Sequence, residues 1–229
     1  GVLAQYVVLP EQGAIRIPDY LSFEEAATLP CAALTAWHAL IEAGHLKAGE
    51  TVLIHGGAGG VGSLGIQIAV ALGARVIATA AERNHDFLRS LGAEPVSYGE
   101  GLSARVRALR PDGVDVAVDF VGGNLEATLA VLAAGGRHAS IADSDVEQHG
   151  GTWMWVNPVG AQLQELADLV DQHNVRVEVA RTFPLPHAAD AFRLNMEGHT
   201  RGKIVVTVDD VVNSTMIAVA LPTLADEFD

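Results

Sequence analysis

Short apolar runs alternate along the chain with longer segments in which apolar residues recur every three or four positions. The short runs predict strands buried on both faces of a parallel sheet, and the longer segments predict helices that pack against it. Strands that alternate with helices indicate a doubly wound α/β fold with a parallel sheet, the Rossmann fold. The expected strands are residues 1–9, 52–54, 75–78, 94–98, 114–121, 137–142, 175–179 and 204–208, and the expected helices are residues 34–43, 64–72, 84–91, 102–109, 124–132, 159–173 and 186–196.

Two polar residues are expected to cap helices. Ser22 stands before Glu24 and Glu25, which place negative charge in a first helical turn. Asn124 follows a Gly-Gly pair and precedes an apolar helical segment. Side chains of both types can accept a hydrogen bond from the free N–H groups of a first turn. We therefore expect a helix to begin directly after each residue.

Residues 51–80 contain a strand, a glycine turn, a helix and a second strand in one continuous segment. Gly57, Gly59 and Gly62 supply the pattern G-x-G-x-x-G where the first strand gives way to the helix. In such a unit the first glycine permits a tight turn, the second lets the backbone approach a pyrophosphate, and the third lets the helix pack closely. Main-chain N–H groups at the start of the helix then face the anion. This segment predicts a dinucleotide-binding unit, and a purely structural glycine turn is the alternative.

The composition excludes several other classes of protein. With 229 residues, 49% hydrophobic and 18% charged, the chain has room for one substantial globular domain and a smaller piece. A net charge of −14 argues against nucleic acid or an anionic membrane as a partner. No apolar run approaches the roughly 20 residues of a membrane span, and no secretory leader follows Gly1. We expect a cytoplasmic protein.

Several segments outside the glycine turn carry a resemblance to a known family. In their order and spacing the chain resembles a medium-chain dehydrogenase/reductase, in the zinc-independent branch of quinone oxidoreductases and the enoyl reductase modules of polyketide synthases. The resemblance covers most of residues 1–208. The matching segments are residues 21–27, 29–30, 34–37, 46–50, 57–62, 91–93, 118–123 and 201–205.

The resemblance also implies a division of the chain. In the family a GroES-like β-barrel domain precedes the strand that residues 1–9 resemble, and we expect this chain to lack most of that barrel. The tail beyond residue 210 lies past the usual end of the family and is interpreted as an amphipathic appendage or a gene-boundary artefact. The expected parts are a remnant of the catalytic-domain wall (1–34), the dinucleotide-binding Rossmann domain (35–180), a C-terminal helix and return strand (181–210) and the tail (211–229).

The residues after the second strand bear on the choice of cofactor. An NAD site needs a carboxylate about twenty residues past the glycine turn, whereas an NADP site has small or basic groups there. Ala80 occupies that region, and Arg83 and Asn84 follow it. Arg83 can pair with a 2′-phosphate, and Asn84 can donate to it. Glu82 is contrary evidence, and a solvated Arg83 is the alternative. The charge pattern favours NADP(H).

The resemblance adds further cofactor residues. It implies that Thr35 lies near the nicotinamide ribose and Tyr98 at the adenosine edge, and Lys203 can reach the same cleft. Val121 and Ile141 are expected at the carboxyl ends of their strands, where ligands bind in open α/β sheets. Tyr98 as an ordinary strand-end residue and Lys203 as a solvated one are the alternatives. The expected cofactor set is Thr35, Gly57, Gly59, Gly60, Val61, Gly62, Ala80, Arg83, Asn84, Tyr98, Val121, Ile141 and Lys203.

Metal chemistry is the rival mechanism. By resemblance, Cys31 matches the position of one catalytic zinc ligand in zinc alcohol dehydrogenases. It is the single cysteine of the chain, and one ligand makes no site. We interpret it as a buried cysteine in apolar surroundings and expect no metal. Trp153 and Trp155 can wall an apolar substrate, but packing or a subunit interface is favoured.

These expectations lead to a function. The chain is predicted to transfer hydride from NADPH to a small-molecule quinone or α,β-unsaturated carbonyl, with no catalytic residue assigned. The alternatives are a catalytically silent NADP(H)-binding fragment or assembly subunit and, within the class, a zinc-dependent alcohol dehydrogenase. An exposed edge strand at residues 175–179 predicts a homodimer.

Overall fold

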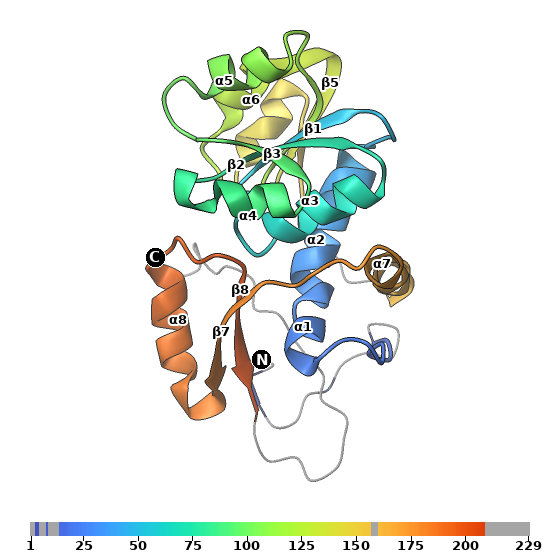
Figure 1. The fold of residues 1–229 in the computed structure, drawn as a ribbon, viewed down its shortest axis with the longest axis vertical. Helices are drawn as coiled ribbons and strands as arrows, with labels where there is room; N and C mark the ends of the chain where they lie inside the picture. The colour runs from blue at the N-terminus through green and yellow to red at the C-terminus, as the bar shows by residue number, and fades with distance from the viewer. Residues whose placement is uncertain (1–2, 5–7, 9–13, 157–159, 209–229) are drawn as a thin grey trace. The chain divides into compact units, whose positions relative to one another are not determined.

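The computed structural model describes residues 3–4, 8, 14–156 and 160–208 of the chain. By its contacts the chain divides into two compact units, and Figure 1 shows the elements of each. One unit spans Thr35–Val156, and the other combines Gly1–Leu34 with Asn157–Asp229. The strand expected at residues 1–9 lies mostly outside the described residues, and the tail at 211–229 lies wholly outside them.

The unit spanning Thr35–Val156 is built on a six-stranded sheet in the order β3-β2-β1-β4-β5-β6. All five strand pairs are parallel, which confirms the predicted doubly wound α/β fold. β6 is a short edge strand that the pattern did not predict. The strands are β1 (Thr51–His55), β2 (Arg75–Thr79), β3 (Ala93–Val96), β4 (Val114–Asp119), β5 (Leu132–Ser140) and β6 (Thr152–Trp153).

Helices cover both faces of this sheet. Figure 1 shows α3 and α4 on one face and α5 and α6 on the other. α5 has the bounds that the sequence predicted. The helical elements are α2 (Leu34–Trp37), the π-helical η3 (His38–Ala43), α3 (Gly62–Ala71), the 3₁₀ turn η4 (Glu82–Asn84), α4 (His85–Ser90), α5 (Leu102–Leu109), α6 (Leu125–Val131) and the 3₁₀ turn η5 (Ser144–His149).

β1 lies at the centre of the sheet and is buried along its whole length. Leu53 belongs to a cluster with Val106 of α5 and Val131 of α6. Ile54 points to the opposite face, toward Gly65 of α3. Because neighbouring side chains of a strand alternate between faces, a strand covered on both sides is expected to be mostly apolar, as Val52–Ile54 at the centre of β1 are. Burial on both faces explains the unbroken apolar run in the sequence.

The second unit contains a separate two-stranded parallel sheet in which β7 pairs with β8. The strand predicted at residues 175–179 is wrong, because β7 begins only at Val179. α7 groups with this unit by its contacts, and the predicted end of the Rossmann domain at residue 180 stays a prediction. Its elements are α1 (Phe23–Ala26), the π-helical η2 (Leu29–Ala33), α7 (Gly160–Gln172), β7 (Val179–Pro184), the 3₁₀ turn η6 (Leu185–His187), α8 (Ala188–Met196) and β8 (Lys203–Thr207).

The two predicted caps have different outcomes. The N–H of Glu25 donates to Oγ of Ser22 (3.2 Å), and the N–H of Ser22 donates to the Glu25 carboxylate (2.9 Å). This reciprocal pair is a capping box, so the cap at Ser22 is confirmed. Asn124 stands at the N-cap of α6 but makes no capping hydrogen bond with its side chain. Its side-chain amide donates instead to Asp119, so the predicted side-chain cap is wrong.

Candidate cofactor-binding site

The glycine turn joins the end of β1 to the start of α3. The residue with left-handed backbone is Gly56 (φ +77°), one position before the G-x-G-x-x-G pattern. Its N–H donates to Oγ1 of Thr79 (3.0 Å), and the N–H of Gly57 donates to the Thr79 carbonyl (2.9 Å). The tight turn therefore depends on Gly56, whereas the sequence analysis assigned that role to Gly57.

Close contacts constrain Gly57, Gly59 and Gly62 to different degrees. A Cβ at Gly57 would lie 2.8 Å from Cβ of Ala78, inside the sheet. A Cβ at Gly62 would lie 2.2 Å from the carbonyl oxygen of Gly56, which is main chain and cannot rotate away. A Cβ at Gly59 would meet the same oxygen at 3.3 Å. Gly62 therefore lets the first turn of α3 lie directly against the glycine turn.

The start of α3 has the features of an anion site. Val61 occupies the N-cap and forms no side-chain capping bond, because its side chain carries no acceptor. The N–H groups of a first helical turn point along the axis, and the helix dipole adds positive potential there. A phosphate group can accept hydrogen bonds from these N–H groups, and its negative charge is attracted by the positive potential. Gly60 and Val61 are half-buried and lie within this segment.

Val121 forms a wall beside the glycine turn. A Cβ at Gly56 would lie 2.7 Å from Cγ1 of Val121, so the valine side chain packs on the turn. Val121 is nevertheless 61% exposed. Ile141 follows the end of β5, where its N–H donates to the carbonyl of Asp119 (3.1 Å). The structure thus brings Val121 and Ile141 to the carboxyl edge of the sheet that also carries the glycine turn.

Asp119 organises the loop that carries Val121. Oδ1 of its carboxylate accepts hydrogen bonds from the N–H groups of Val121 (2.9 Å) and Gly122 (3.0 Å) and from Nδ2 of Asn124 (3.2 Å). This Asx-type turn closes the strand and sets the direction of the following residues. No role for Asp119 was predicted from the sequence. An aspartate two residues before a Val-Gly-Gly turn was the signal that could have found it.

His55 ends β1 but is enclosed in the interior. Its Nε2 lies 3.0 Å from Oγ1 of Thr128, and its Nδ1 has no hydrogen-bond partner among the described residues. Burial lowers the pKa of His55, while the charge of Asp119 acts in the opposite direction. Because the side chain is fully buried, His55 supports α6 and does not reach the surface of the edge.

The ends of β2 and β3 lie side by side. The N–H of Ala80, which is buried, donates to the carbonyl of Val96 (3.0 Å). η4 follows Ala80 and places Arg83 on the surface, where it forms no hydrogen bond or ion pair with the described residues. Asn84 is half-buried, and Tyr98 is 53% exposed. These predicted adenosine-side residues all follow one pair of adjacent strand ends.

Thr35 and Lys203 belong to different compact units. Thr35 lies in α2 and is 5% exposed, within the unit of the glycine turn. Lys203 begins β8 in the other unit. Burial lowers the pKa of Lys203, and the nearby Cys31 acts in the opposite direction. A cofactor role for either residue stays a prediction.

Within the described ranges no group of three or more His, Cys, Asp or Glu side chains could hold a metal ion. Cys31 lies in η2 and is half-buried, which is more exposed than the sequence analysis predicted. The described side chains therefore do not supply a zinc ligand set.

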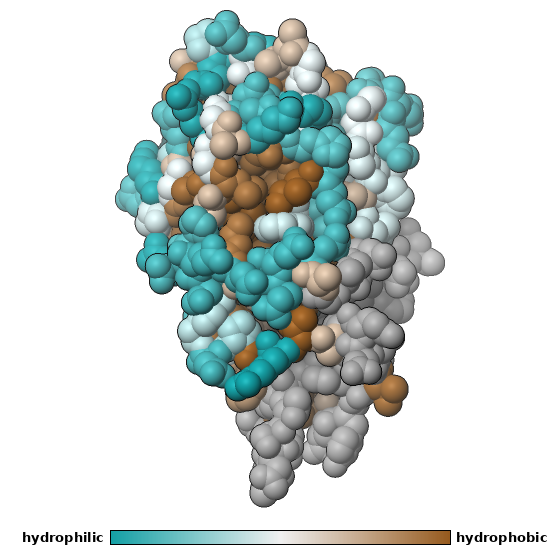
Figure 2. Space-filling model, turned by 90° about the vertical axis from the view of Figure 1, so that its right-hand side faces the viewer, coloured by the Kyte–Doolittle hydropathy of each residue, from teal (hydrophilic) through white to brown (hydrophobic). Residues whose placement is uncertain are grey.

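Trp153 and Trp155 form an edge-to-face pair with ring centroids 6.2 Å apart. Trp155 is 69% exposed and Trp153 37%. Figure 2 shows a separate patch of apolar residues within a polar rim; its residues are not labelled, and the tryptophan pair is not placed in it. The pair supplies an exposed aromatic surface at the β6 edge, and its role as a substrate wall or an interface stays a prediction.

Comparisons with known proteins agree with this geometry. The family model described as zinc-binding dehydrogenase matches residues 91–206, just over half of the chain. The polyketide synthase GfsB of Streptomyces halstedii is 34% identical over an alignment of 224 residues, and the match covers 91% of this chain and 4% of the synthase. The chain thus spans a small part of that relative.

Two solved structures are also similar. The quinone oxidoreductase of Coxiella burnetii has 36% identity and a TM-score of 0.76, with 85% of this chain and 63% of that chain covered. The mycobacterial protein Rv1454c, solved as a complex with NADPH, has 29% identity and a TM-score of 0.74, with coverages of 83% and 66%. The matches confirm the resemblance on which the sequence analysis relied. This chain belongs to the zinc-binding dehydrogenase family, a part of the medium-chain dehydrogenase/reductases.

Proposed function

We propose that this chain is the cofactor-binding part of an oxidoreductase that transfers hydride from NADPH to a quinone or an α,β-unsaturated carbonyl compound. The observation that carries the proposal is the turn from β1 into α3, where Gly62 brings the uncapped helix start against Gly56 at the carboxyl edge of a parallel sheet. Ligands of open α/β sheets bind at this edge. The similarity to a quinone oxidoreductase and to an NADPH complex supports the choice of substrate and cofactor.

The described residues suggest how the cofactor is held. The pyrophosphate would bind the N–H groups of Gly60, Val61 and Gly62, because the N–H of Gly59 already donates to the Gly56 carbonyl (3.0 Å). Val121 and Ile141 line the edge on the nicotinamide side, and Arg83, Asn84 and Tyr98 contact the adenosine 2′-phosphate. Thr35 and Lys203 complete the predicted set. When bound, the cofactor supplies the hydride, and the residues of the chain bind and orient it.

The two alternative functions require different features of the chain. A catalytically silent NADP(H)-binding fragment or an assembly subunit needs the same glycine turn but gives no turnover. A zinc alcohol dehydrogenase needs a ligand set, and the described residues place only Cys31 at a position that resembles such a site. No step of the proposal passes through a metal, and no catalytic residue is assigned.

A homodimer in the cytoplasm remains part of the proposal, with a small molecule as substrate. The edge at residues 175–179 no longer supports the dimer, because β7 begins at Val179 and pairs with β8. Among the described helices, none is long and apolar enough to cross a membrane. Light scattering of the purified chain during size-exclusion chromatography tests the dimer.

The cofactor assignment is tested by titrating the chain with NADPH and with NADH while following nicotinamide fluorescence. NADPH should bind more tightly, and Arg83→Ala should weaken NADPH binding by about 10- to 150-fold while changing NADH binding little, because a charge-assisted contact to phosphate contributes roughly 1.5–3 kcal/mol. Arg75→Ala is the matched control, since Arg75 is exposed at the opposite end of β2. Equal binding of the two nucleotides, unchanged in Arg83→Ala, would remove the assignment. Turnover with a quinone then separates an enzyme from a binding module.

A further inference from the structure

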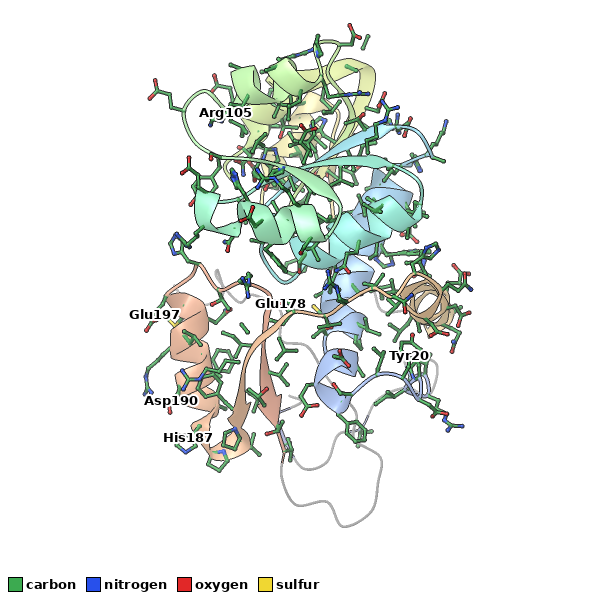
Figure 3. The ribbon with its side chains drawn as sticks, viewed as in Figure 1. Tyr20, Arg105, Glu178, His187, Asp190 and Glu197 are labelled. Carbon is green, nitrogen blue, oxygen red and sulfur yellow. The ribbon has the colours of Figure 1, made fainter. Side chains whose placement is uncertain are left out.

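The loop between β3 and α5, residues 97–101, is held by a single side chain. Nε and Nη2 of Arg105 both donate to the carbonyl of Ser97, at 3.0 and 2.8 Å. Nη1 donates to the carbonyl of Glu100 (2.9 Å), and Nη2 lies within 3.3–3.4 Å of the carbonyls of Tyr98 and Gly99. Arg105 comes from the first turn and a half of α5 and lies beside this loop (Figure 3). One guanidinium therefore binds four consecutive carbonyl groups.

The backbone of the loop explains how the carbonyls converge. Gly99 (φ +86°) and Gly101 (φ +77°) have left-handed backbone, which curls the chain around the guanidinium. A Cβ at Gly101 would lie 3.1 Å from Nη1 of Arg105, so the side chain fills the space inside the curl. The planar fork of arginine suits this arrangement because it presents N–H groups in several fixed directions. A lysine carries the same charge without that fork.

Arg105 directs its donors inward, in contrast to Arg83. Nε, Nη1 and Nη2 all donate to carbonyls of the loop. The guanidinium is thus unsuited to bind a ligand directly. Among the described residues no carboxylate lies within ion-pair distance of it. Arg105 therefore acts as a clamp, by which we mean that its guanidinium holds the loop backbone in place through hydrogen bonds to the loop carbonyls.

The clamped loop carries Tyr98 at the adenosine edge of the site. The loop leaves the sheet at Val96, whose carbonyl accepts the N–H of Ala80 at the end of β2 (3.0 Å). Tyr98 follows two residues later, with its carbonyl held by Arg105 and its side chain exposed. Fixing the backbone on both sides of a residue limits the directions that its side chain can take. Arg105 thereby restricts where the Tyr98 ring and hydroxyl can lie.

We propose that Arg105 is a positioning residue that sets the preference of this site for NADPH over NADH, by holding residues 97–100 so that Tyr98 faces the adenosine 2′-phosphate. The proposal rests on the proposed cofactor function and adds to it a residue that never touches the cofactor. NADH lacks the 2′-phosphate, so loosening the loop weakens NADPH more than NADH. The quantity that Arg105 controls is the ratio of the two dissociation constants.

The first test compares Arg105→Ala and Arg105→Lys with the unmodified chain by the same nucleotide titrations. Both variants should lower the NADPH preference by roughly five- to tenfold, which corresponds to the loss of about one positioned contact. The lysine variant keeps the positive charge and loses the fork, so it separates the clamp from a general electrostatic effect. If Arg105→Lys retains the full preference, the proposal is overturned.

Arg107→Ala is the matched control, because Arg107 lies on the same helix and also donates to carbonyls, those of Ala130, Pro111 and Leu132. These contacts tie α5 to α6 and β5 and do not involve the Tyr98 loop. Arg107→Ala should lower the melting temperature and leave the NADPH preference unchanged. Circular dichroism on all variants establishes that the preference is measured on folded protein. A fall in preference in Arg107→Ala equal to that in Arg105→Ala would reduce Arg105 to a general structural role.

A double-mutant cycle with Tyr98→Ala identifies the route of the effect. If Arg105 acts through Tyr98, Arg105→Lys should change the preference little once Tyr98 is absent. Additive effects of the two substitutions would contradict the proposal. The unmodified chain tests the underlying function separately, because failure to bind either nucleotide removes the proposed function, whereas a clear NADPH preference that survives Arg105→Ala removes only the role of Arg105.

Discussion

The two sheets of this molecule are buried to very different degrees. Every residue of β1 is buried, and β4 has a single half-buried position. In the two-stranded sheet, Phe183 is the buried residue of β7 and Val205 that of β8. A two-stranded sheet has little stability of its own. The comparison teaches that the six-stranded sheet provides a rigid frame for the glycine turn, whereas the smaller sheet contributes less packing energy per residue.

The largest effect should come from filling the closest contact of the glycine turn. Gly62→Val places a side chain where a Cβ already lies 2.2 Å from the Gly56 oxygen, so unfolding free energy should fall by about 3 kcal/mol or more. Gly59→Ala meets the same oxygen at 3.3 Å and should cost far less. Urea denaturation followed by circular dichroism measures both. Wild-type stability in Gly62→Val would show that the turn is not as close as described.

The same substitution in the two sheets tests the comparison directly. Val116→Ala, at a fully buried position of β4, should cost about 2–3 kcal/mol of unfolding free energy, because it removes two buried methyl groups and leaves a cavity. Val205→Ala, in β8, should cost about 1 kcal/mol, because its surroundings are more exposed. Chemical denaturation of the two variants gives the difference. Equal costs would contradict the contrast between the sheets.

A partly buried ion pair at the opposite end of the six-stranded sheet should have a smaller effect. Nη2 of Arg137 lies 2.6 Å from the Glu50 carboxylate, and this hydrogen bond is the main reason that the pKa of Glu50 is lowered. A carboxyl group with a lowered folded pKa contributes stability above its ordinary pKa of 4.5 and loses it as the pH falls through the folded value. Arg137→Met should therefore cost about 1–2 kcal/mol at pH 7 and flatten the stability profile below pH 4.5.

The control for that pair is the exposed pair of Arg89 with Asp86 (2.7 Å). Arg89→Met should change stability by less than about 0.5 kcal/mol, because solvent screens an exposed pair. Urea denaturation of both variants across pH 3–7 makes the measurement. An unchanged pH profile in Arg137→Met would contradict the role assigned to the pair.

The smallest effect should come from His138 in β5. Burial is the main cause that lowers its pKa, a hydrogen bond to the Val146 backbone opposes it, and His149 adds to the lowering. The unfolded chain then binds more protons, so stability is complete above the ordinary pKa of 6.5 and falls as the pH drops toward the folded value. His138→Leu should lose less stability between pH 7 and pH 5 than the unmodified chain. Thermal melts of both proteins across this pH range measure the difference. Stability profiles of the variant and the unmodified chain that run parallel would contradict this prediction.

Burial also explains how much of the fold could be predicted. The bounds of α5 followed from its helical period, and the residues of β1 followed from a short apolar run that ends at a glycine turn. The alternation of valines at residues 175–179 continues into β7, so the pattern did not fix where pairing begins. That choice depends on the register with β8, where Val179 lies opposite Lys203, and on a register shift between Val179 and Arg181. Pairing between distant segments is not encoded in a local period.

The candidate site shows a similar limit. The glycine turn was predictable because its glycines occur at a characteristic spacing between a strand and a helix. The residue with left-handed backbone is nevertheless Gly56, not Gly57. Asp119 and Arg105 were not predicted, because each forms hydrogen bonds with the backbone of a loop and neither belongs to a recognisable sequence motif. Asn124 was assigned to a helix cap because its competing partner, the Asp119 carboxylate, is visible only in the folded loop. Side chains that support loops are hard to recognise from sequence alone.

The central claim is that a diphosphate binds the main chain where β1 turns into α3. The most direct test is to follow the backbone ¹H–¹⁵N resonances of the chain during an NADPH titration. The account predicts that the amides of Gly60, Val61 and Gly62 show the largest shifts. Saturable binding that leaves these three amides unperturbed and shifts resonances elsewhere would contradict it.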